Sequence, residues 1–139
     1  MLSAINQNLK SKTQKQTINS ILRFIASKFQ ISIEGAKEFK EKVTDSDKPV
    51  IVDFYADWCG PCRMIAKPLD KFVDSHEGKV ILAKVNVDRN DELAFQYEVS
   101  GIPTVYGFYK GKVVDRFVGL PEEDFLKKFV EKMVKTGEK

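Results

Sequence analysis

Two cysteines separated by two residues constrain this chain more than any other feature, because they lie where a strand-like segment meets a helix-like one. Residues 50–55 are β-branched or aromatic except for Asp53, which indicates a buried strand. The residues after Cys62 have the pattern of a helix, so Cys59 is predicted at a helix N-terminus. Unpaired N–H groups and the helix dipole favour a negative charge there, and the reactive thiolate carries one. The spacing therefore predicts a dithiol in which Cys62 can attack a disulfide formed at Cys59.

Two structural interpretations of this cysteine pair are weaker. A structural zinc site needs about four ligands, whereas the chain contains two Cys and one His. A permanent disulfide that closes so short a loop would constrain little of the unfolded chain. We therefore interpret Cys59 and Cys62 as a redox-active pair, and we expect no metal.

Several segments resemble the thioredoxin family. Residues 52–62, Val-Asp-Phe-Tyr-Ala-Asp-Trp-Cys-Gly-Pro-Cys, are similar to that family's active-site segment. Residues 83–88, 99–104, 111–112 and 117–119 then follow in the family's order, so that the resemblance runs from about residue 29 to the C-terminus. It implies the thioredoxin fold, an α/β three-layer sandwich in which helices flank both faces of a mixed central β-sheet.

The alternation of strand and helix patterns over residues 29–139 agrees with this architecture. Strands are predicted at residues 29–33, 50–55, 80–86, 104–109 and 113–118. Helices are predicted at residues 36–43, 59–76, 91–97 and 121–135. The last two strands should form a hairpin across Gly111-Lys112. Pro121 should open the last helix, whose apolar stripe is predicted to contain Phe125, Phe129, Val130 and Met133.

The resemblance implies a role for each cysteine. Cys59 would be the nucleophile that attacks a substrate disulfide, and Cys62 would be the resolving thiol, held one turn deeper and less exposed. The two residues would form the redox disulfide after each cycle. Pro61 suits the first helical turn, where its missing N–H costs nothing.

Asp53 interrupts an apolar strand, so its carboxyl group is expected inside the protein. A buried carboxylate is costly unless it is paired or protonated. The resemblance implies that Asp53 transfers a proton to and from Cys62, and that Lys84 on a neighbouring strand modulates Asp53. The alternatives are structural hydrogen bonding for Asp53 and a surface position at a strand edge for Lys84.

Pro103 matches a family proline that follows a cis peptide bond and faces the dithiol. Such a bond would present the backbone of Ile102 to an extended substrate, which could pair with it as an added strand. The implied substrate-binding residues are Trp58, Gly60, Pro61, Ile102, Pro103 and Gly119. Core packing is the alternative for Trp58, and a turn that requires glycine is the alternative for Gly119.

The charge of the chain is unevenly distributed. Residues 1–33 contain five basic residues and no acid, whereas residues 34–139 hold all 20 acids and have a net charge of −2. This basic start, with apolar residues at helical spacing, resembles a mitochondrial transit peptide, which we assign to residues 1–28 before a thioredoxin domain at 29–139. The expected location is the mitochondrial matrix, or the cytoplasm if the segment is retained. The sequence has no apolar run of about 7–15 residues after its first charges, as a secretory signal would need. It also has no run of about 20 apolar residues, as a membrane span would need.

These features predict a thiol-disulfide oxidoreductase that reduces protein disulfides and supports mitochondrial redox homeostasis. The resemblance implies recharging by thioredoxin reductase with electrons from NADPH, and peroxiredoxins and methionine sulfoxide reductases as partners. The chain has no glycine-rich nucleotide fingerprint, so no bound nicotinamide or flavin is expected. The folded part has no basic surface for nucleic acid, and we expect a monomer without membrane attachment.

Two other functional classes stay open. One is a disulfide oxidant or isomerase, against which the Gly60-Pro61 dipeptide and the missing secretory signal argue. The other is a non-catalytic binding module within a larger complex, in which both cysteines would be dispensable.

Overall fold

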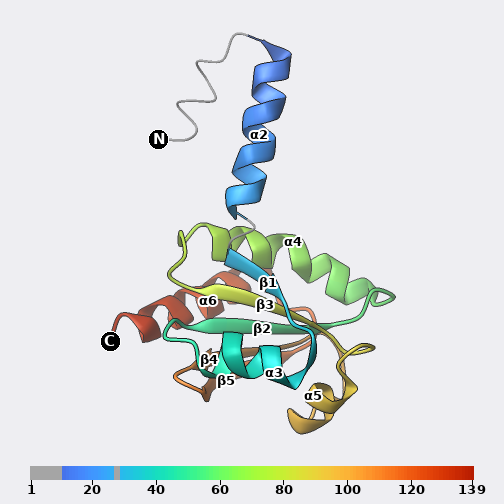
Figure 1. The fold of residues 1–139 in the computed structure, drawn as a ribbon. Coiled ribbons are helices and arrows are strands. Elements are labelled where there is room, and N and C mark those ends of the chain that lie inside the picture. The colour runs from blue at the N-terminus through green and yellow to red at the C-terminus, as the bar shows by residue number, and fades with distance from the viewer. Residues whose placement is uncertain (1–10, 27–28) are drawn as a thin grey trace.

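The computed structural model describes residues 11–26 and 29–139 of the chain. Helices and strands alternate along most of its length (Figure 1). The strands are β1 (Gln30–Ser32), β2 (Val50–Tyr55), β3 (Ile81–Asn86), β4 (Thr104–Tyr109) and β5 (Lys112–Val118). The helices are α2 (Lys12–Ala26), α3 (Gly35–Phe39), α4 (Gly60–Asp74), α5 (Asp91–Gln96) and α6 (Glu123–Gly137), and a π-helical segment, Lys40–Thr44, continues α3.

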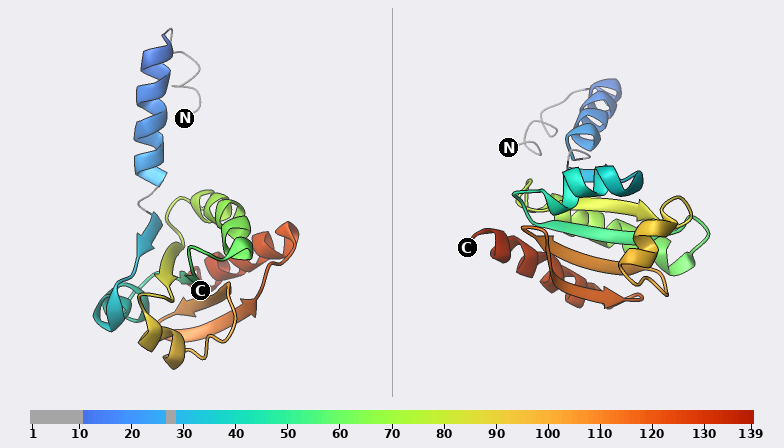
Figure 2. Two further views of the ribbon diagram at one scale, coloured as in Figure 1. Left: turned by 90° about the vertical axis from the view of Figure 1, so that its right-hand side faces the viewer. Right: turned by 60° about the horizontal axis from the view of Figure 1, so that its bottom comes forward.

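The strands form a mixed sheet in the order β1-β3-β2-β4-β5. β2 is parallel to β3 and antiparallel to β4, which places it at the centre. The two edges are β1, which is only three residues long, and β5, which carries Lys112, Asp115 and Arg116. Helices α4 and α6 cover one face of the sheet, and α3 and α5 cover the other (Figures 1 and 2). This arrangement confirms the predicted α/β three-layer sandwich.

The alternation of side chains along β2 builds a core on each face. Ile51 belongs to the core under α4 and α6, together with Leu69 of α4 and Val130 of α6. Phe54 belongs to the core under α3 and α5, together with Phe39 of α3. Burial of each such side chain contributes about 1.5–3 kcal/mol. Because both faces of β2 are covered, its residues 50–54 all lie inside the protein.

The predicted hairpin turn and the predicted start of the last helix are both wrong. The turn between β4 and β5 consists of Lys110 and Gly111, with φ angles of 50° and 76°, because Lys112 already pairs with Tyr109 in the sheet. Consecutive residues with positive φ are the requirement of the tight turn that matches the twist of a hairpin. Helix α6 begins at Glu123 with Glu122 at its N-cap, so Pro121 precedes the helix and does not open it.

The apolar stripe of α6 also differs from the prediction, because Leu126 is buried in place of Phe125 and Val134 is buried as well. The residues of α6 that are buried against the sheet are Leu126, Phe129, Val130, Met133 and Val134. This set follows the spacing of one helix face, and it leaves Phe125 49% exposed at the margin. The Phe125 ring still packs edge-on against Phe117 of β5, with 5.4 Å between ring centroids.

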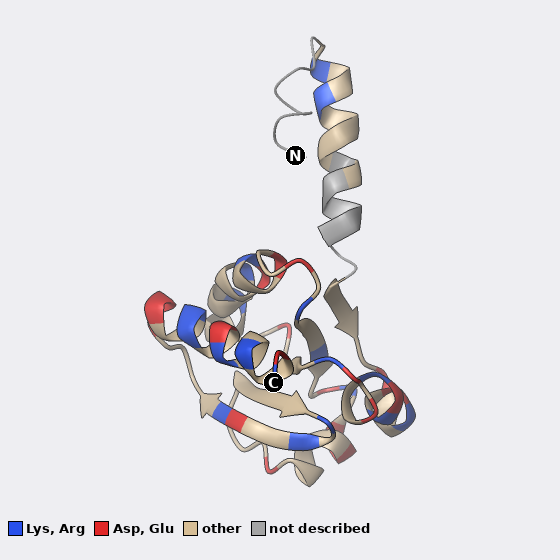
Figure 3. Cartoon of the chain, turned by 90° about the vertical axis from the view of Figure 1, so that its left-hand side faces the viewer, with Lys and Arg blue, Asp and Glu red and all other residues tan. Residues whose placement is uncertain are grey.

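Helix α2 extends away from the layered part of the molecule (Figure 1). Among the residues coloured by charge in Figure 3, α2 shows Lys12 and Lys15 and no acid. The predicted transit peptide, residues 1–28, includes α2, while its residues 1–10 and 27–28 lie outside the described part. No helix within the described ranges has the length and apolar character needed to cross a membrane.

Asn90 joins two loops at the carboxyl ends of β1 and β3. Its side-chain amide donates hydrogen bonds to the carbonyl oxygens of Asn86 at 2.9 Å and Ile33 at 3.3 Å, and its oxygen accepts one from the N–H of Gly35 at 2.7 Å. The residue is 4% exposed. Backbone N–H and C=O groups in loops lack the hydrogen-bond partners that a helix or sheet would provide. The Asn90 side chain supplies these partners to the two loops.

We expect Asn90→Ala to lower the free energy of unfolding by about 2–3 kcal/mol, because it leaves buried backbone groups without partners. Urea unfolding at pH 7 would measure the change as a lower midpoint. Gln96→Ala, at an exposed position of the nearby helix α5, is the control and should change stability by less than about 0.5 kcal/mol. Equal midpoints for Asn90→Ala and the wild type would contradict the role given to this side chain.

Candidate active site

Both cysteines lie at the start of helix α4, just beyond the end of the central strand. Cys59 is the N-cap residue of α4 with extended backbone angles, and its sulfur accepts a hydrogen bond from the N–H of Cys62 at 3.2 Å. Gly60 and Pro61 form the first helical positions, which confirms the prediction for Pro61. A negative charge on the Cys59 sulfur would therefore be stabilised by the N–H of Cys62 and by the positive end of the helix dipole.

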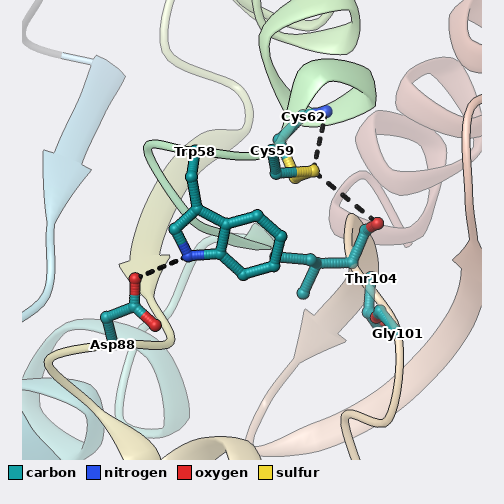
Figure 4. The surroundings of a disulfide bond; sticks show 7 residues. Trp58, Cys59, Cys62, Asp88, Gly101 and Thr104 are labelled. Atoms are coloured by element: carbon teal, nitrogen blue, oxygen red, sulfur yellow. Dashed lines mark hydrogen bonds between the residues drawn. A yellow bond between two sulfur atoms is a disulfide. The ribbon is translucent and has the colours of Figure 1, made fainter.

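Cys59 and Cys62 form a disulfide, with 5.3 Å between their Cα atoms (Figure 4). Both residues are 4% exposed, so the prediction that Cys62 is less exposed than Cys59 is wrong for this oxidised state. Both cysteines pack with Ala56 in one small buried cluster. The two sulfurs differ instead in their surroundings, because that of Cys59 lies 3.8 Å from the carbonyl oxygen of Ile102, whereas Cys62 lines a pocket.

The loop opposite the disulfide contains the predicted cis peptide bond, between Ile102 and Pro103. Pro103 itself is buried, and its carbonyl oxygen accepts a hydrogen bond from the N–H of Gly119 at 2.9 Å. Gly119 has a φ of 92°, a left-handed conformation that favours glycine. The turn that requires glycine is therefore real, and it fixes the loop that faces the disulfide.

The side chain of Trp58 lies on the surface beside the disulfide and is 68% exposed, which excludes core packing. Its indole N–H donates to a carboxylate oxygen of Asp88 at 3.0 Å (Figure 4). Trp58 and Ile102 line one shallow pocket together with Val87, Val99, Ser100 and Gly101. Asp88 is not among the residues that the sequence predicts for the site, although the N–H of a tryptophan commonly finds a hydrogen-bond partner. Trp58 and Ile102, two of the residues expected to bind substrate, therefore line the same pocket.

Asp53 is the buried acid of the site. It is 2% exposed, and its Oδ1 atom accepts no hydrogen bond from any residue in the described ranges. Burial raises the pKa of Asp53 to about 7, the charge of Lys84 opposes this rise, and that of Asp70 adds to it. Asp53 and Cys62 line the same pocket of about 230 Å³. The lack of a hydrogen bond at Oδ1 argues against an aspartate held by structural hydrogen bonds, and proton transfer between Asp53 and Cys62 stays a prediction.

Lys84 lies directly opposite Asp53 in the register of β2 and β3. Because β3 lies between β1 and β2, the alternative of a lysine at a strand edge is wrong. The Lys84 ammonium group pairs with Asp70 of α4, with 3.1 Å between Nζ and Oδ1. Sequence analysis did not identify Asp70, because an acid next to the apolar stripe of a helix is an ordinary surface residue.

Comparison with known proteins agrees with the fold and the site. The thioredoxin family model matches residues 30–132, so the chain belongs to the thioredoxin family. The mitochondrial thioredoxin of Mus musculus is 44% identical over 103 residues, which are 74% of this chain and 62% of that protein. A probable thioredoxin-2 of Caenorhabditis elegans is 39% identical over 129 residues, 93% of this chain and 88% of that one.

The solved structure of a mutant thioredoxin from Halobacterium salinarum NRC-1 matches with a TM-score of 0.68 and 37% identity. The match covers 76% of this chain and 90% of that one. Thioredoxin-family proteins work without a prosthetic group. Over residues 11–26 and 29–139, no cluster of three or more His, Cys, Asp or Glu side chains is arranged to hold a metal ion.

The raised pKa of Asp53 makes stability depend on pH. Its pKa in the folded protein, about 7, exceeds the value of 3.8 expected when unfolded, so folding binds a proton between these values and stability falls as pH rises from about 4 to 7. We expect Asp53→Asn to remove this loss and to be more stable than the wild type by about 4 kcal/mol above pH 8, at about 1.4 kcal/mol per pH unit.

Urea unfolding of both oxidised proteins at pH 4.5 and pH 8 would test this expectation. Asp47→Asn changes an exposed aspartate and should leave the difference between the two pH values as in the wild type. A stability advantage of Asp53→Asn that is the same at both pH values would show that Asp53 does not titrate in this range.

Proposed function

We propose that this protein is a thiol-disulfide oxidoreductase that reduces protein disulfides with the Cys59/Cys62 dithiol. The observation that carries the proposal is the disulfide at the N-terminus of α4, placed in a fold of the thioredoxin family. The chain spans 62% of the length of the mouse mitochondrial relative. Activity, substrates and partners are therefore inferred from this chain's own site.

The reduced protein starts with Cys59 as thiolate and nucleophile. Its sulfur attacks one sulfur of the substrate disulfide, the substrate S–S bond breaks, and the other substrate sulfur leaves as a thiolate. Cys62 then attacks the Cys59 sulfur of the mixed disulfide and releases the second substrate thiolate. Two electrons pass to the substrate, and the Cys59–Cys62 bond of the oxidised protein remains.

Asp53 is the proposed proton acceptor and donor for Cys62. The resolving thiol must lose a proton before it attacks, and a carboxyl group with a pKa of about 7 can take that proton near neutral pH. The shared pocket gives the two groups a common space for the transfer, directly or through water. In the reverse direction, protonated Asp53 returns the proton when the disulfide is reduced again.

The surface around the disulfide is the proposed substrate-binding site. Trp58, Gly60, Pro61 and Ile102 surround it, while the bond from Gly119 to Pro103 holds the loop in place. An extended substrate could pair with the backbone of Ile102 and place its own disulfide against Cys59. The exposed indole of Trp58 would then cover the apolar part of that segment.

The oxidised protein needs an electron donor, for which we propose a thioredoxin reductase that draws on NADPH. The proposed substrates are disulfide-containing proteins, among them peroxiredoxins and methionine sulfoxide reductases. Recharging requires the partner's dithiol to attack the Cys59–Cys62 bond, so it uses the same exposed surface as the substrates.

The decisive experiment is insulin disulfide reduction by the full chain with NADPH and a thioredoxin reductase. We expect turnover in the wild type and a loss of more than about 100-fold in Cys59→Ser, because without the nucleophile no mixed disulfide can form. Cys62→Ser should instead accumulate the mixed disulfide, which mass spectrometry would detect. A folded wild-type protein without turnover would indicate an oxidant or a binding module.

The mitochondrial matrix is the proposed location. Residues 1–28 are basic and contain no acid, a composition typical of mitochondrial transit peptides. Relatives that share 44% identity are named mitochondrial thioredoxins. We propose that the segment directs import and is then removed.

A reporter fused behind residues 1–28 should enter mitochondria. The matched control replaces Lys10, Lys12, Lys15 and Arg23 with glutamine, which keeps the apolar spacing and removes most of the positive charge. We expect the control to stay in the cytosol, and fluorescence imaging with a mitochondrial marker would score both. A wild-type segment that leaves the reporter diffuse would refute the import role.

A further inference from the structure

The Lys84 ammonium group lies near two carboxyl groups, those of Asp53 and Asp70. It lies opposite Asp53 in the sheet register, on the face that α4 covers, and Asp70 of α4 lies above the same face. The ammonium group pairs with Asp70, and Asp53 forms no ion pair with any described residue. Lys84 and Asp70 are 24% and 30% exposed, so the pair lies between the buried acid and solvent.

We propose that Asp70 is a positioning residue that holds the Lys84 ammonium group away from Asp53 and thereby keeps Asp53 able to carry a proton. The inference rests on the proposed proton transfer between Asp53 and Cys62 and extends it to a residue that does not line their pocket. Asp70 would act through Lys84 and would not touch the reacting sulfur atoms.

The competition follows from the charges and from the flexible stem of lysine. An ammonium group that reaches a buried carboxylate lowers the carboxyl pKa by about 1–3. Four side-chain carbons allow Lys84 to point toward either acid. Asp70 is partly exposed whereas Asp53 is buried, so an ion pair of Lys84 with Asp70 requires less desolvation than one with Asp53.

Asp74 is a second acid that could hold the Lys84 ammonium group away from Asp53, but the contacts of Asp74 argue against this role. Asp74 lies one turn beyond Asp70 on α4, and the side-chain amide of Gln30 lies 3.4 Å from both of its carboxylate oxygens. Burial raises the pKa of Asp74, and its hydrogen bond with Gln30 opposes the rise. Gln30 thus supplies a neutral donor to Asp74, which leaves the Lys84 ammonium group to Asp70.

Other titratable or charged groups face the pocket and must be included in the test. They are Tyr55 of β2, Asp57 in the following loop, Cys62 and Arg63 of α4, and Lys84 of β3. In the oxidised protein Cys62 does not titrate, because it is bonded to Cys59. A titration of the oxidised form therefore reports on Asp53 without interference from the thiols.

The test is a double-mutant cycle on the oxidised full chain, with the Asp53 carboxyl carbon followed by NMR from pH 5 to 9. We expect Asp70→Asn to lower the titration midpoint of Asp53 by about one pH unit or more, because Lys84 becomes free to pair with it. Lys84→Gln should raise the midpoint. Adding Asp70→Asn to Lys84→Gln should then lower it by less than half as much as in the wild-type background.

Two matched variants distinguish the ion pair between Asp70 and Lys84 from a general effect of negative charge on the midpoint of Asp53. Asp70→Glu keeps a carboxylate for Lys84 and should restore a midpoint close to that of the wild type. Asp57→Asn removes one negative charge from the pocket lining without touching the ion pair, and it should shift the midpoint much less than Asp70→Asn. If asparagine at position 70 impairs folding, Asp70→Ser provides the same test.

Equal shifts by Asp70→Asn in the two backgrounds would overturn the proposal, since Asp70 would then act only through its own charge. No shift in the wild-type background would overturn it as well. The NMR titration needs no substrate, so its outcome is independent of insulin reduction. A protein that fails to reduce insulin but shows the expected cycle would refute the proposed function and support the arrangement of the three charges.

Discussion

The central position of β2 is the constraint on which the site depends. Strand β2 pairs with β3 on one side and with β4 on the other, and helices cover both of its faces. The carboxyl group of Asp53 is therefore buried. The same strand delivers the chain to Cys59 at its end, where α4 begins. One buried strand therefore fixes both the acid with a raised pKa and the helix start that favours a thiolate. The chemistry of the two sulfurs follows from this arrangement.

Burial of Asp53 lowers the stability of the fold when its carboxyl group is ionised, and the two hydrophobic cores offset this loss. A buried carboxyl group without a hydrogen-bond partner at one oxygen destabilises the ionised form of the fold. The two cores on either side of the sheet contain many fully buried aliphatic and aromatic side chains, and each contributes about 1.5–3 kcal/mol. Sites that use strained or unsatisfied groups commonly depend on such a surplus.

The sequence predicted most of the fold because its strands and helices follow strong apolar periods. It also placed Cys59, Cys62 and Pro61 correctly at the start of a helix. The cis bond before Pro103, which the resemblance to the thioredoxin family implied, is confirmed as well. Two errors of the sequence-based prediction are shifts of one residue along the chain. The hairpin turn lies at Lys110-Gly111 and not at Gly111-Lys112, and Phe125 lies at the margin of the buried face of its helix. Contacts between segments distant in sequence, such as Trp58 with Asp88 and Lys84 with Asp70, carry no local signal and needed the three-dimensional arrangement.

The two edges of the sheet have a consequence for how the protein meets other chains. β1 offers only three residues for pairing, and β5 presents Lys112, Asp115 and Arg116 along its length. Short strands and charged side chains discourage a foreign strand from extending a sheet. The sheet of this molecule is thus protected from extension by other polypeptide chains. The main-chain pairing proposed for the Ile102 loop would then be confined to that loop, and it would end with the exchange of sulfur bonds.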